Sequence, residues 1–402
     1  MVSLAEIQEA AKIIHGNVLH TPLVYSATFS KMTGTKVYLK LETLQLGGSF
    51  KIRGATYKIQ SNLDKIRSKG VVAASVGNHA QGVALAARAA SIPATIVMPV
   101  WASITKQEAT REYGAELILE GESLLDSIRI GQELAIKSGR MFIHPYDDAE
   151  VTVGQGTIGL EILEDLPDPD LIVVPVGGGG LIAGITTAVK ALRPQTRVVG
   201  VQAEACPSAY EALRCGRPVT VEEKSSIADA ILVTRVGETD FNILRDKVDE
   251  ISLVDEDKIA EAIILLLERK KVLAEGGGAV PLAALLGHSL RVPEGSKVVL
   301  VISGGNVDSL LLDRIISQGL RLHGRLMRLS VCLEDVPGSL ARISAIIASH
   351  GANVVHIHHF RNERGLSIDS TRVDLELETR GFQHIRKIED ALKKNGFRIR
   401  IL

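Results

Sequence analysis

The segment GGSFKIR, which runs from Gly47 to Arg53, contains a lysine whose amine could do chemistry. Gly47 and Gly48 interrupt the preceding structure, Ser49 is suited to cap a helix, and an apolar stripe follows. Lys51 would therefore lie in a first helical turn, where the helix dipole and apolar neighbours disfavour its charged form. Such a lysine is a candidate nucleophilic amine. A surface lysine whose side chain extends into solvent fits this motif equally well.

A second segment, LIVVPVGGGGLIAGITTAVKAL, has the composition of an anion-binding site. The glycines from Gly177 to Gly180 separate a buried strand from a helix that begins near Leu181. Unhindered backbone amides at a helix N-terminus favour phosphate binding. The chain lacks the Lys and Ser/Thr that complete a nucleoside triphosphatase P-loop.

The same glycines leave a second interpretation open. Gly178, Gly180 and Ala183 fit the G-x-G-x-x-G/A pattern of dinucleotide-binding proteins. Glu204 follows a later strand at about the spacing of a ribose-binding acid. An NAD-dependent dehydrogenase is therefore the rival hypothesis at this point.

Two more motifs stand at the ends of predicted strands. GVVAAS continues into VGNHAQG, which puts Ser75, Asn78 and His79 at a carboxyl end, and KVVLVIS puts Ser303 at another. Ligands bind at these ends in open α/β sheets, so the side chains can meet Lys51 in one crevice. A single Asn or Ser in a turn is usually only a cap, so a binding site is predicted here because several such features converge.

The elements that would position these residues follow an alternating pattern. Hydrophobic residues make up 46% of the 402 residues and aromatic residues only 3%, so the apolar content suits parallel strands covered by helices. From about residue 36 to residue 320, β-branched runs alternate with Ala-rich helical stretches, which predicts a doubly wound α/β fold. The predicted strands are KVYLKLE, GVVAAS, ATIVMPV, AELILE, LIVVPV, RVVGVQ and KVVLVIS.

The order of elements changes near the C-terminus. Residues 321–328 carry several arginines and are predicted to be a linker. Residues 329–402 then predict the order βαββαβ, with apolar and charged residues alternating in TRVDLELET as in a strand with one wet face. The predicted sheet has helices on one side only.

Charge and composition exclude several classes of partner. The net charge of −1 provides no field to attract nucleic acid or an anionic membrane. No apolar run reaches the roughly 20 residues of a membrane span, and the N-terminus lacks the features of a signal peptide. Cys206, Cys215 and Cys332 form no CxxC pair, so neither disulfides nor a thiolate metal site is indicated. We expect a cytoplasmic protein that acts on small molecules.

The motifs GSFKIRGA, SVGNHAQG, VGGGGL and SGGN, found in this order, resemble those of the fold-type II (tryptophan synthase β-like) pyridoxal-phosphate enzymes. The resemblance is to the threonine dehydratases, or threonine ammonia-lyases, with serine racemase and serine dehydratase as relatives. It covers residues 1–320 and implies a small subdomain, roughly residues 48–145, inserted in a larger one. The implied cofactor is pyridoxal 5'-phosphate, joined to Lys51 as a Schiff base.

The resemblance also implies roles for individual residues. Those implied to hold the cofactor are Lys51, Phe50, Asn78, Gly177, Gly178, Gly179, Gly180, Leu181, Ser303 and Glu275. Glu275, a loop glutamate before glycines, could equally be structural. Those implied to hold the substrate are Ser75, Val76, Gly77, Asn78 and His79. Lys51 would be the catalytic base.

The implied reaction converts L-threonine to 2-oxobutanoate and ammonia, with L-serine as a secondary substrate. Val76 stands where the racemase has a serine, and a valine cannot return a proton to the opposite face. Serine dehydratase or racemase activity remains an alternative. The relatives' metal site would need Glu204 and an acid near Tyr210, so we expect no metal. A regulatory protein with a dead catalytic domain is the third hypothesis.

The C-terminal segment, with DVPGSL and GANV, resembles the ACT domains, which are ferredoxin-like βαββαβ modules that bind amino acids. In that family ligands lie where two such domains meet, which implies an allosteric effector near Asp335, Gly338, Leu340 and Asn353 and a homodimer or homotetramer. A dimerisation module without a ligand is the alternative. The resemblance leaves open whether the role is threonine degradation or isoleucine biosynthesis.

Overall fold

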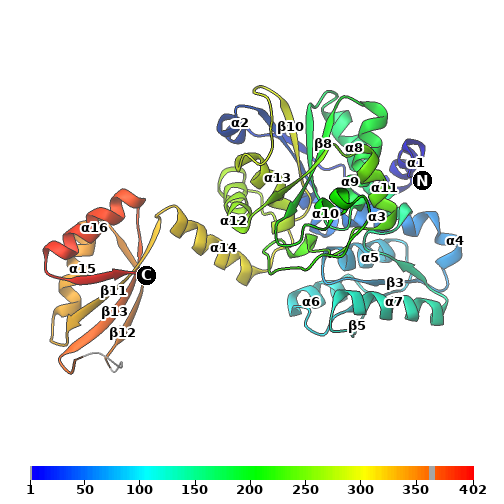
Figure 1. Cartoon of the computed structure of the whole chain (residues 1–402). Coiled ribbons are helices and arrows are strands. Elements are labelled where there is room, and N and C mark those ends of the chain that lie inside the picture. The colour runs from blue at the N-terminus through cyan, green and yellow to red at the C-terminus, as the bar shows by residue number, and fades with distance from the viewer. Residues whose placement is uncertain (1, 362–366) are drawn as a thin grey trace. The chain divides into compact units, whose positions relative to one another are not determined.

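The computed structural model describes residues 2–361 and 367–402, and the chain forms two compact units, residues 1–308 and 309–402 (Figure 1). This division comes earlier than the sequence-based boundaries at 320 and 329. The helix α14 (Ser309–Leu322) groups with the second unit, and β11 begins at Leu326. Residues 321–328 are therefore the end of a helix, a short turn and the start of a strand.

The larger sheet of the first unit has the strand order β1-β2-β10-β7-β8-β9. All neighbours are parallel except β1 and β2, which are antiparallel. The last strand in sequence, β10, therefore lies in the interior of the sheet between β2 and β7. The strands are β1 (Leu23–Tyr25), β2 (Lys36–Leu41), β7 (Leu171–Pro175), β8 (Arg197–Ala203), β9 (Glu250–Val254) and β10 (Lys297–Ile302).

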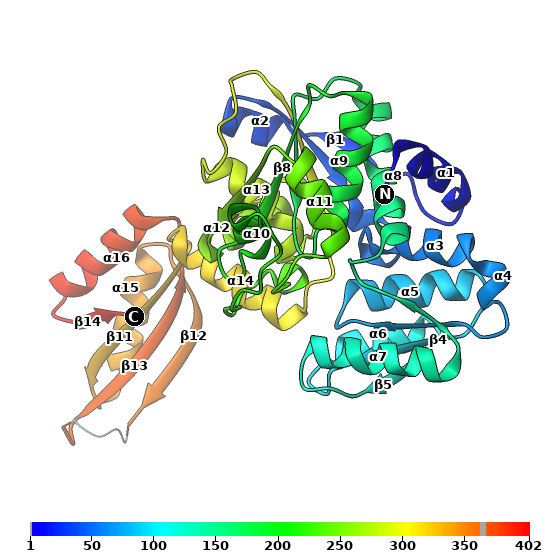
Figure 2. The same cartoon turned by 45° about the vertical axis from the view of Figure 1, so that its right-hand side comes forward.

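Helices cover both faces of this sheet, which explains why its central strands are almost wholly apolar. Every residue of β7 is buried, as are five of the six in β10. Figure 2 shows α9 and α11 on one side of the sheet and α12 and α13 on the other. Because both faces are buried, these strands lack the alternation of apolar and polar residues that is expected when one face is exposed to solvent.

The smaller sheet has the order β5-β4-β3-β6, with all strands parallel. Alternate residues of β3 point to opposite faces of this sheet. Val71 and Ala73 pack in one apolar cluster with α3 and α5, and Val72 and Ala74 pack in another with α7. Its strands are β3 (Val71–Ala74), β4 (Ala94–Met98), β5 (Glu116–Leu119) and β6 (Met141–Ile143).

The helices of the first unit connect and cover these sheets. They are α1 (Leu4–Ile14), α2 (Ala27–Thr33), α3 (Lys51–Ser61), α4 (Leu63–Ile66), α5 (Asn78–Ala89), α6 (Ile104–Glu112), α7 (Leu124–Ser138), α8 (Ala149–Asp165), α9 (Gly180–Leu192), α10 (Ser208–Cys215), α11 (Glu238–Lys247), α12 (Glu256–Leu265) and α13 (Gly276–Leu286). Each predicted strand of the first unit is present, within a residue or two at its ends. The α/β class with two open sheets is confirmed.

The second unit contains a four-stranded antiparallel sheet in the order β12-β13-β11-β14. Its elements are β11 (Leu326–Glu334), α15 (Ser339–Ser349), β12 (Asn353–Phe360), β13 (Ser370–Glu378), α16 (Phe382–Lys394) and β14 (Arg398–Ile401). The predicted βαββαβ order is confirmed, and both helices lie on one face of the sheet (Figure 1). Glu376 departs from the predicted wet face, because Arg328 and Arg321 bind and cover it.

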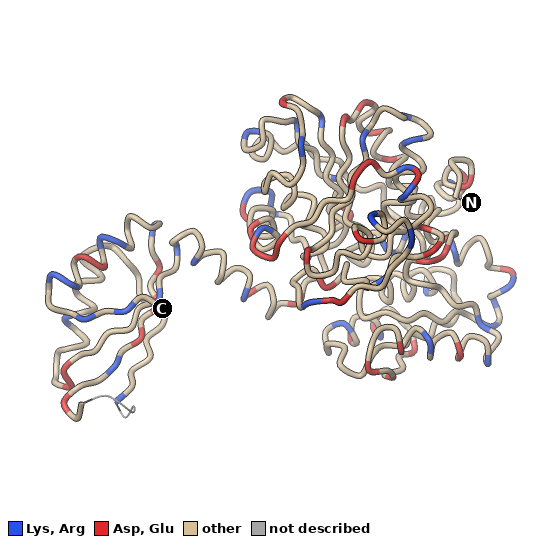
Figure 3. Tube along the Cα trace, viewed as in Figure 1, with Lys and Arg blue, Asp and Glu red and all other residues tan. Residues whose placement is uncertain are grey.

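Charged residues of both signs are interspersed along each unit (Figure 3). This distribution agrees with the net charge of −1. Among the described residues, none of the helices combines the length and the apolar character needed to cross a bilayer.

Candidate active site

The loop before α3 is held against the end of β10. Ser49 forms an isolated bridge with Gly304, and the Phe50 amide donates a hydrogen bond to the Ser303 carbonyl oxygen at 3.1 Å. The position of Ser49 suggested a helix cap, but Phe50 occupies the N-cap position of α3 and no side chain caps the helix there. Lys51 is the first helical residue, as predicted, and lies beside the strand end that carries Ser303.

The side chain of Lys51 is in an environment that favours its neutral form. Nζ donates a hydrogen bond to the Pro145 carbonyl oxygen at 2.8 Å and lies 5.2 Å from the centre of the Phe50 ring. Burial lowers the pKa of Lys51 to about 8, although the charges of Glu275 and Asp240 oppose the shift. Roughly a tenth of the amine is therefore free base at pH 7, about 300-fold more than at the ordinary pKa of 10.5, and this is the form that a nucleophile or proton acceptor requires.

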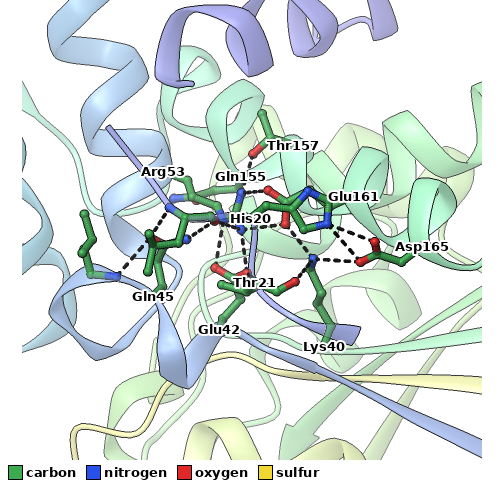
Figure 4. A network of polar contacts seen from close by, with 12 residues as sticks. His20, Thr21, Lys40, Glu42, Gln45, Arg53, Gln155, Thr157, Glu161 and Asp165 are labelled. Atoms are coloured by element: carbon green, nitrogen blue, oxygen red, sulfur yellow. Dashed lines mark hydrogen bonds and ion pairs between the residues drawn. The ribbon is translucent and has the colours of Figure 1, made fainter. Parts of the chain in front are cut away.

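A buried ion network around Arg53, two residues after Lys51, anchors α3 (Figure 4). The fully buried guanidinium of Arg53 binds Glu42 at 2.8 Å and Glu161 at 2.5 Å. Lys40 binds the same Glu161 at 2.6 Å. Despite the opposing effect of burial, the two carboxylates raise the pKa of Arg53 above its ordinary value. The network joins α3 to β2 and α8, so the backbone of Lys51 has little freedom.

The glycine loop between β7 and α9 has no room for side chains. A Cβ added to Gly178 would lie 2.1 Å from Cγ of Tyr146, and Gly179 has a φ of 111°, which favours glycine. The loop ends at the N-terminus of α9, whose first amides have no partner within the helix. This arrangement fits a phosphate group.

Asn78 and Glu275 form a hydrogen-bonded pair that lines the same pocket as Lys51 and the glycine loop. Asn78 Nδ2 donates to Glu275 Oε1 at 2.7 Å, and Asn306 Nδ2 donates to Asn78 Oδ1 at 2.8 Å. Burial, with the nearby Asp229, raises the pKa of Glu275 to about 8, although its bond with Asn78 opposes the shift. The amide of Asn78 is thereby held in one orientation.

A pocket lies among these groups. All the residues that the sequence predicted to hold the cofactor line it: Phe50, Lys51, Asn78, Gly177, Gly178, Gly179, Gly180, Leu181, Glu275 and Ser303. A phosphate cradle at one end and a buried amine with a lowered pKa near it fit pyridoxal phosphate.

The predicted substrate residues line a wider pocket that shares Lys51, Asn78 and Glu275 with the first. They are Ser75, Val76, Gly77, Asn78 and His79. Ser75 Oγ accepts a hydrogen bond from the Gly77 amide at 3.1 Å, which shapes the turn. His79 is bound through Nε2 to the Ile143 carbonyl oxygen, and burial lowers its pKa to about 3. His79 is therefore a neutral, fixed side chain.

The four residues predicted to hold an effector do not come together within one chain. Asp335, Gly338 and Leu340 lie near the start of α15, whereas Asn353 begins β12 beyond the end of that helix. The 11 residues of α15 span roughly 16 Å. If both groups contact one ligand, the second group must come from another copy of the chain.

Sequence reasoning missed several residues that line the pockets or support them. Pro145 and Tyr146 come from the segment after β6, a strand that was not predicted. Asn306 belongs to the SGGN motif but received no role. Asp240, whose carboxyl is buried against the glycine loop, is the third residue of α11 and has the appearance of an ordinary acidic residue in a first helical turn.

Comparison with known proteins agrees with this geometry. The model of the family "Pyridoxal-phosphate dependent enzyme" matches residues 14–304, and that of the ACT domain matches residues 327–396. The chain is 47% identical over 402 residues, all of both chains, to the L-threonine ammonia-lyase of Thermotoga maritima.

Solved structures of related proteins are also similar to the chain. A threonine deaminase from T.th. is 41% identical, with a TM-score of 0.72 over 76% of this chain and 99% of that chain. Maize serine racemase is 35% identical, with a TM-score of 0.75 over 80% of this chain and 98% of that chain. These similarities replace the dinucleotide-binding interpretation of the glycine loop. The chain belongs to the family of pyridoxal-phosphate-dependent enzymes and carries an ACT domain at its C-terminus.

Proposed function

We propose that the chain is a threonine ammonia-lyase, which converts L-threonine to 2-oxobutanoate and ammonia and accepts L-serine as a secondary substrate. The observation that carries the proposal is the position of Lys51, a buried amine with a lowered pKa in a pocket that also contains a phosphate cradle. The full-length similarity to the L-threonine ammonia-lyase of Thermotoga maritima supports the choice of substrate.

Each group of residues has a role in this reaction. The bound cofactor supplies an electron sink for the electron pair left at the substrate Cα. Lys51 Nζ, as a free base, takes the Cα proton. The amides of the Ser75–His79 turn bind the substrate carboxylate, and Gly177–Gly180 bind the cofactor phosphate. Asn78 and Ser303 orient the cofactor ring.

The test is turnover of L-threonine by the purified, cofactor-loaded chain. We expect equal amounts of a 2-oxo acid and ammonia, and a loss of at least several hundredfold in Lys51→Ala, because general base catalysis contributes about 10²–10⁴-fold. Lys137→Ala is the matched control, since Lys137 is exposed near the end of α7 and lines neither pocket. Absence of a 2-oxo acid from the wild-type reaction would refute the proposal.

The similarity to maize serine racemase makes racemisation the second candidate. Val76 lines the wider pocket and carries no group that can donate a proton, which favours elimination. With L-serine, we expect pyruvate without accumulation of D-serine, measured by chiral chromatography. Formation of D-serine at a rate comparable to that of pyruvate would favour the racemase.

We also propose that the ACT domain regulates the enzyme by binding an amino acid between two copies of the chain. The separation of Asp335 from Asn353 along α15 supports a site built from two protomers, and hence a homodimer or homotetramer. Adding isoleucine, valine, threonine or a nucleotide one at a time to the threonine assay tests this, together with measurement of the molecular mass in solution. A monomer at assay concentrations would refute the two-protomer site.

A further inference from the structure

Asp240 places a buried carboxyl oxygen without a partner at the phosphate cradle. The side chain is fully buried in the first turn of α11. Oδ1 accepts a hydrogen bond from the Thr152 hydroxyl at 2.9 Å, whereas Oδ2 has no hydrogen-bond partner among the described residues. A buried polar atom without a partner is costly, so the fold must gain something from it.

The free oxygen lies against the glycine loop. A Cβ built on Gly180 would lie 3.4 Å from Oδ2, and one built on Gly179 would lie 3.5 Å from the same atom. These glycines form the N-terminus of α9, where a phosphate is bound through backbone amides. Oδ2 therefore lies against the two glycines whose amides would bind the phosphate, although Asp240 is not among the residues that line the pocket.

The charges around Asp240 determine its protonation state. Lys51 on α3 is the neighbouring cation, Asp147 and Asp148 precede α8, and the Tyr146 hydroxyl is the other titratable group nearby. Burial raises the pKa of Asp240 well above its usual range, and the two aspartates add to this, while the Thr152 bond and Lys51 oppose it. A phosphate with about two negative charges near neutral pH would favour the neutral carboxyl further.

The Thr152 hydroxyl at Oδ1 and the anion at the loop together select the oxygen that carries the proton, because a proton on Oδ1 would leave Oδ2 as an acceptor that faces the anion. Because the threonine hydroxyl donates to Oδ1, that atom acts as the carbonyl oxygen of the acid. The hydroxyl of a neutral carboxyl group is then Oδ2, the atom that faces the loop. An ionised Asp240 would instead present a negative charge to the anion that the loop binds.

We propose that Asp240 is a cofactor-binding residue, which stays protonated in the loaded enzyme and donates a hydrogen bond from Oδ2 to a phosphate oxygen held by Gly177–Gly180. Asp240 thus lets the site distinguish a phosphorylated ligand from the same ligand without its phosphate. The inference depends on the cofactor that the family uses and holds for any amino-acid substrate.

The first experiment compares ligand affinity in cofactor-free, full-length variants. Asp240→Asn keeps an acceptor toward Thr152 and a donor toward the loop, so it should bind pyridoxal phosphate about as tightly as the wild type near neutral pH. Asp240→Ala should bind pyridoxal phosphate and inorganic phosphate about 10-fold to 100-fold more weakly, the usual effect of one hydrogen bond to a charged group. Its affinity for pyridoxal, which lacks the phosphate, should be unchanged.

Asp246→Asn is the matched control, because Asp246 lies on the same helix, is exposed and pairs with Arg245. Unchanged or tighter phosphate binding in Asp240→Ala would overturn the proposal. An equal loss for pyridoxal phosphate and pyridoxal would also overturn it, because that result indicates a structural effect on the whole pocket.

The second experiment measures the protonation state of Asp240 in the holoenzyme and does not require Asp240→Ala to fold. Infrared difference spectra between wild type and Asp240→Asn should contain the carbonyl band of a protonated carboxylic acid, and the ³¹P resonance of the bound cofactor should differ between them. As pH rises, the wild type should lose affinity for inorganic phosphate relative to Asp240→Asn. A carboxylate band at neutral pH, or parallel pH profiles, would overturn the proposal.

Discussion

At the scale of single residues, the charges of Lys51 and Glu275 are coupled across the pocket. The charge of Glu275 raises the pKa of Lys51, against burial, which lowers it to about 8. In Glu275→Gln this support is removed, so the pKa of Lys51 should fall further. The pH at which the cofactor-free protein captures pyridoxal phosphate at half its maximal rate should decrease by less than about one unit, because burial raises the pKa of Glu275 itself to about 8 and its carboxyl is only partly ionised there.

Absorbance stopped-flow measurements across the pH range test this prediction. Glu223→Gln is the control, because Glu223 lines the wider pocket but is not among the charges that shift Lys51. A profile that moves to higher pH in Glu275→Gln would contradict the assigned sign.

His79 should make stability depend on pH. Its folded-state pKa of about 3 is below the unfolded value of about 6.5, so between these values the unfolded chain binds a proton that the folded chain does not. The contribution is fully present above about pH 6.5 and is lost as pH falls, by about 1.4 kcal/mol per pH unit at most.

Urea unfolding of wild type and His79→Gln, at about pH 7 and about pH 5, tests this contribution. The wild type should lose more free energy of unfolding than the variant on acidification. Equal losses in the two proteins would show that His79 is not the group responsible.

Much of the pocket could be predicted at this scale, because its residues lie in short motifs next to strand ends. Lys51, Ser303 and the glycine loop could each be found from local sequence. Asp240 and Tyr146 could not, since neither stands in such a motif and their positions depend on long-range packing against the glycines. The roles of all these residues remain predictions.

At the scale of elements, the network of Arg53 determines how α3 is anchored. Arg53→Met should destabilise the fold by about 3–5 kcal/mol, because it leaves buried carboxylates without their partner. The double variant Arg53→Met/Glu42→Gln should recover part of this loss. Arg129→Met, which removes an exposed pair with Glu133 on α7, should change the free energy of unfolding by less than about 1 kcal/mol.

Urea denaturation of the three variants, followed by circular dichroism, measures these differences. We expect the double variant to be more stable than Arg53→Met. A double variant that is less stable than Arg53→Met would show that the two side chains do not act together.

The elements with strong apolar patterns could be predicted, and the short ones could not. The strands β1 and β6 have three residues each, too few to produce a detectable period, and β9 is interrupted by polar residues. The position of β10 within the sheet was also beyond local reasoning, because strand order depends on pairing between distant segments.

At the scale of the whole molecule, the two pockets belong to the first unit alone. Every residue that lines them lies within residues 1–308. A chain that ends at Asp308 should therefore retain cofactor binding and threonine turnover but lose any response to added amino acids. The T.th. threonine deaminase, which matches only 76% of this chain, supports the independent folding of such a chain.

Cofactor absorbance and the threonine assay, with and without each amino acid, compare this truncated chain with the full-length protein. A truncated chain that still responds to an amino acid would place the effector site in the first unit. The sequence predicted correctly an α/β unit followed by a βαββαβ unit. The exact division at 308 depends on which unit α14 packs with, and the local sequence pattern does not predict such packing.

The interior position of β10 has a consequence for biosynthesis. The strands β2 and β7 leave the ribosome well before residues 297–302 are translated, so the nascent chain has a gap in its larger sheet. The bridge from Ser49 to Gly304 and the bond from Phe50 to Ser303 cannot form until that gap is filled. Until then, exposed strand edges remain open to wrong pairing. Cofactor loading should therefore be a late event, which follows translation of nearly the entire first unit.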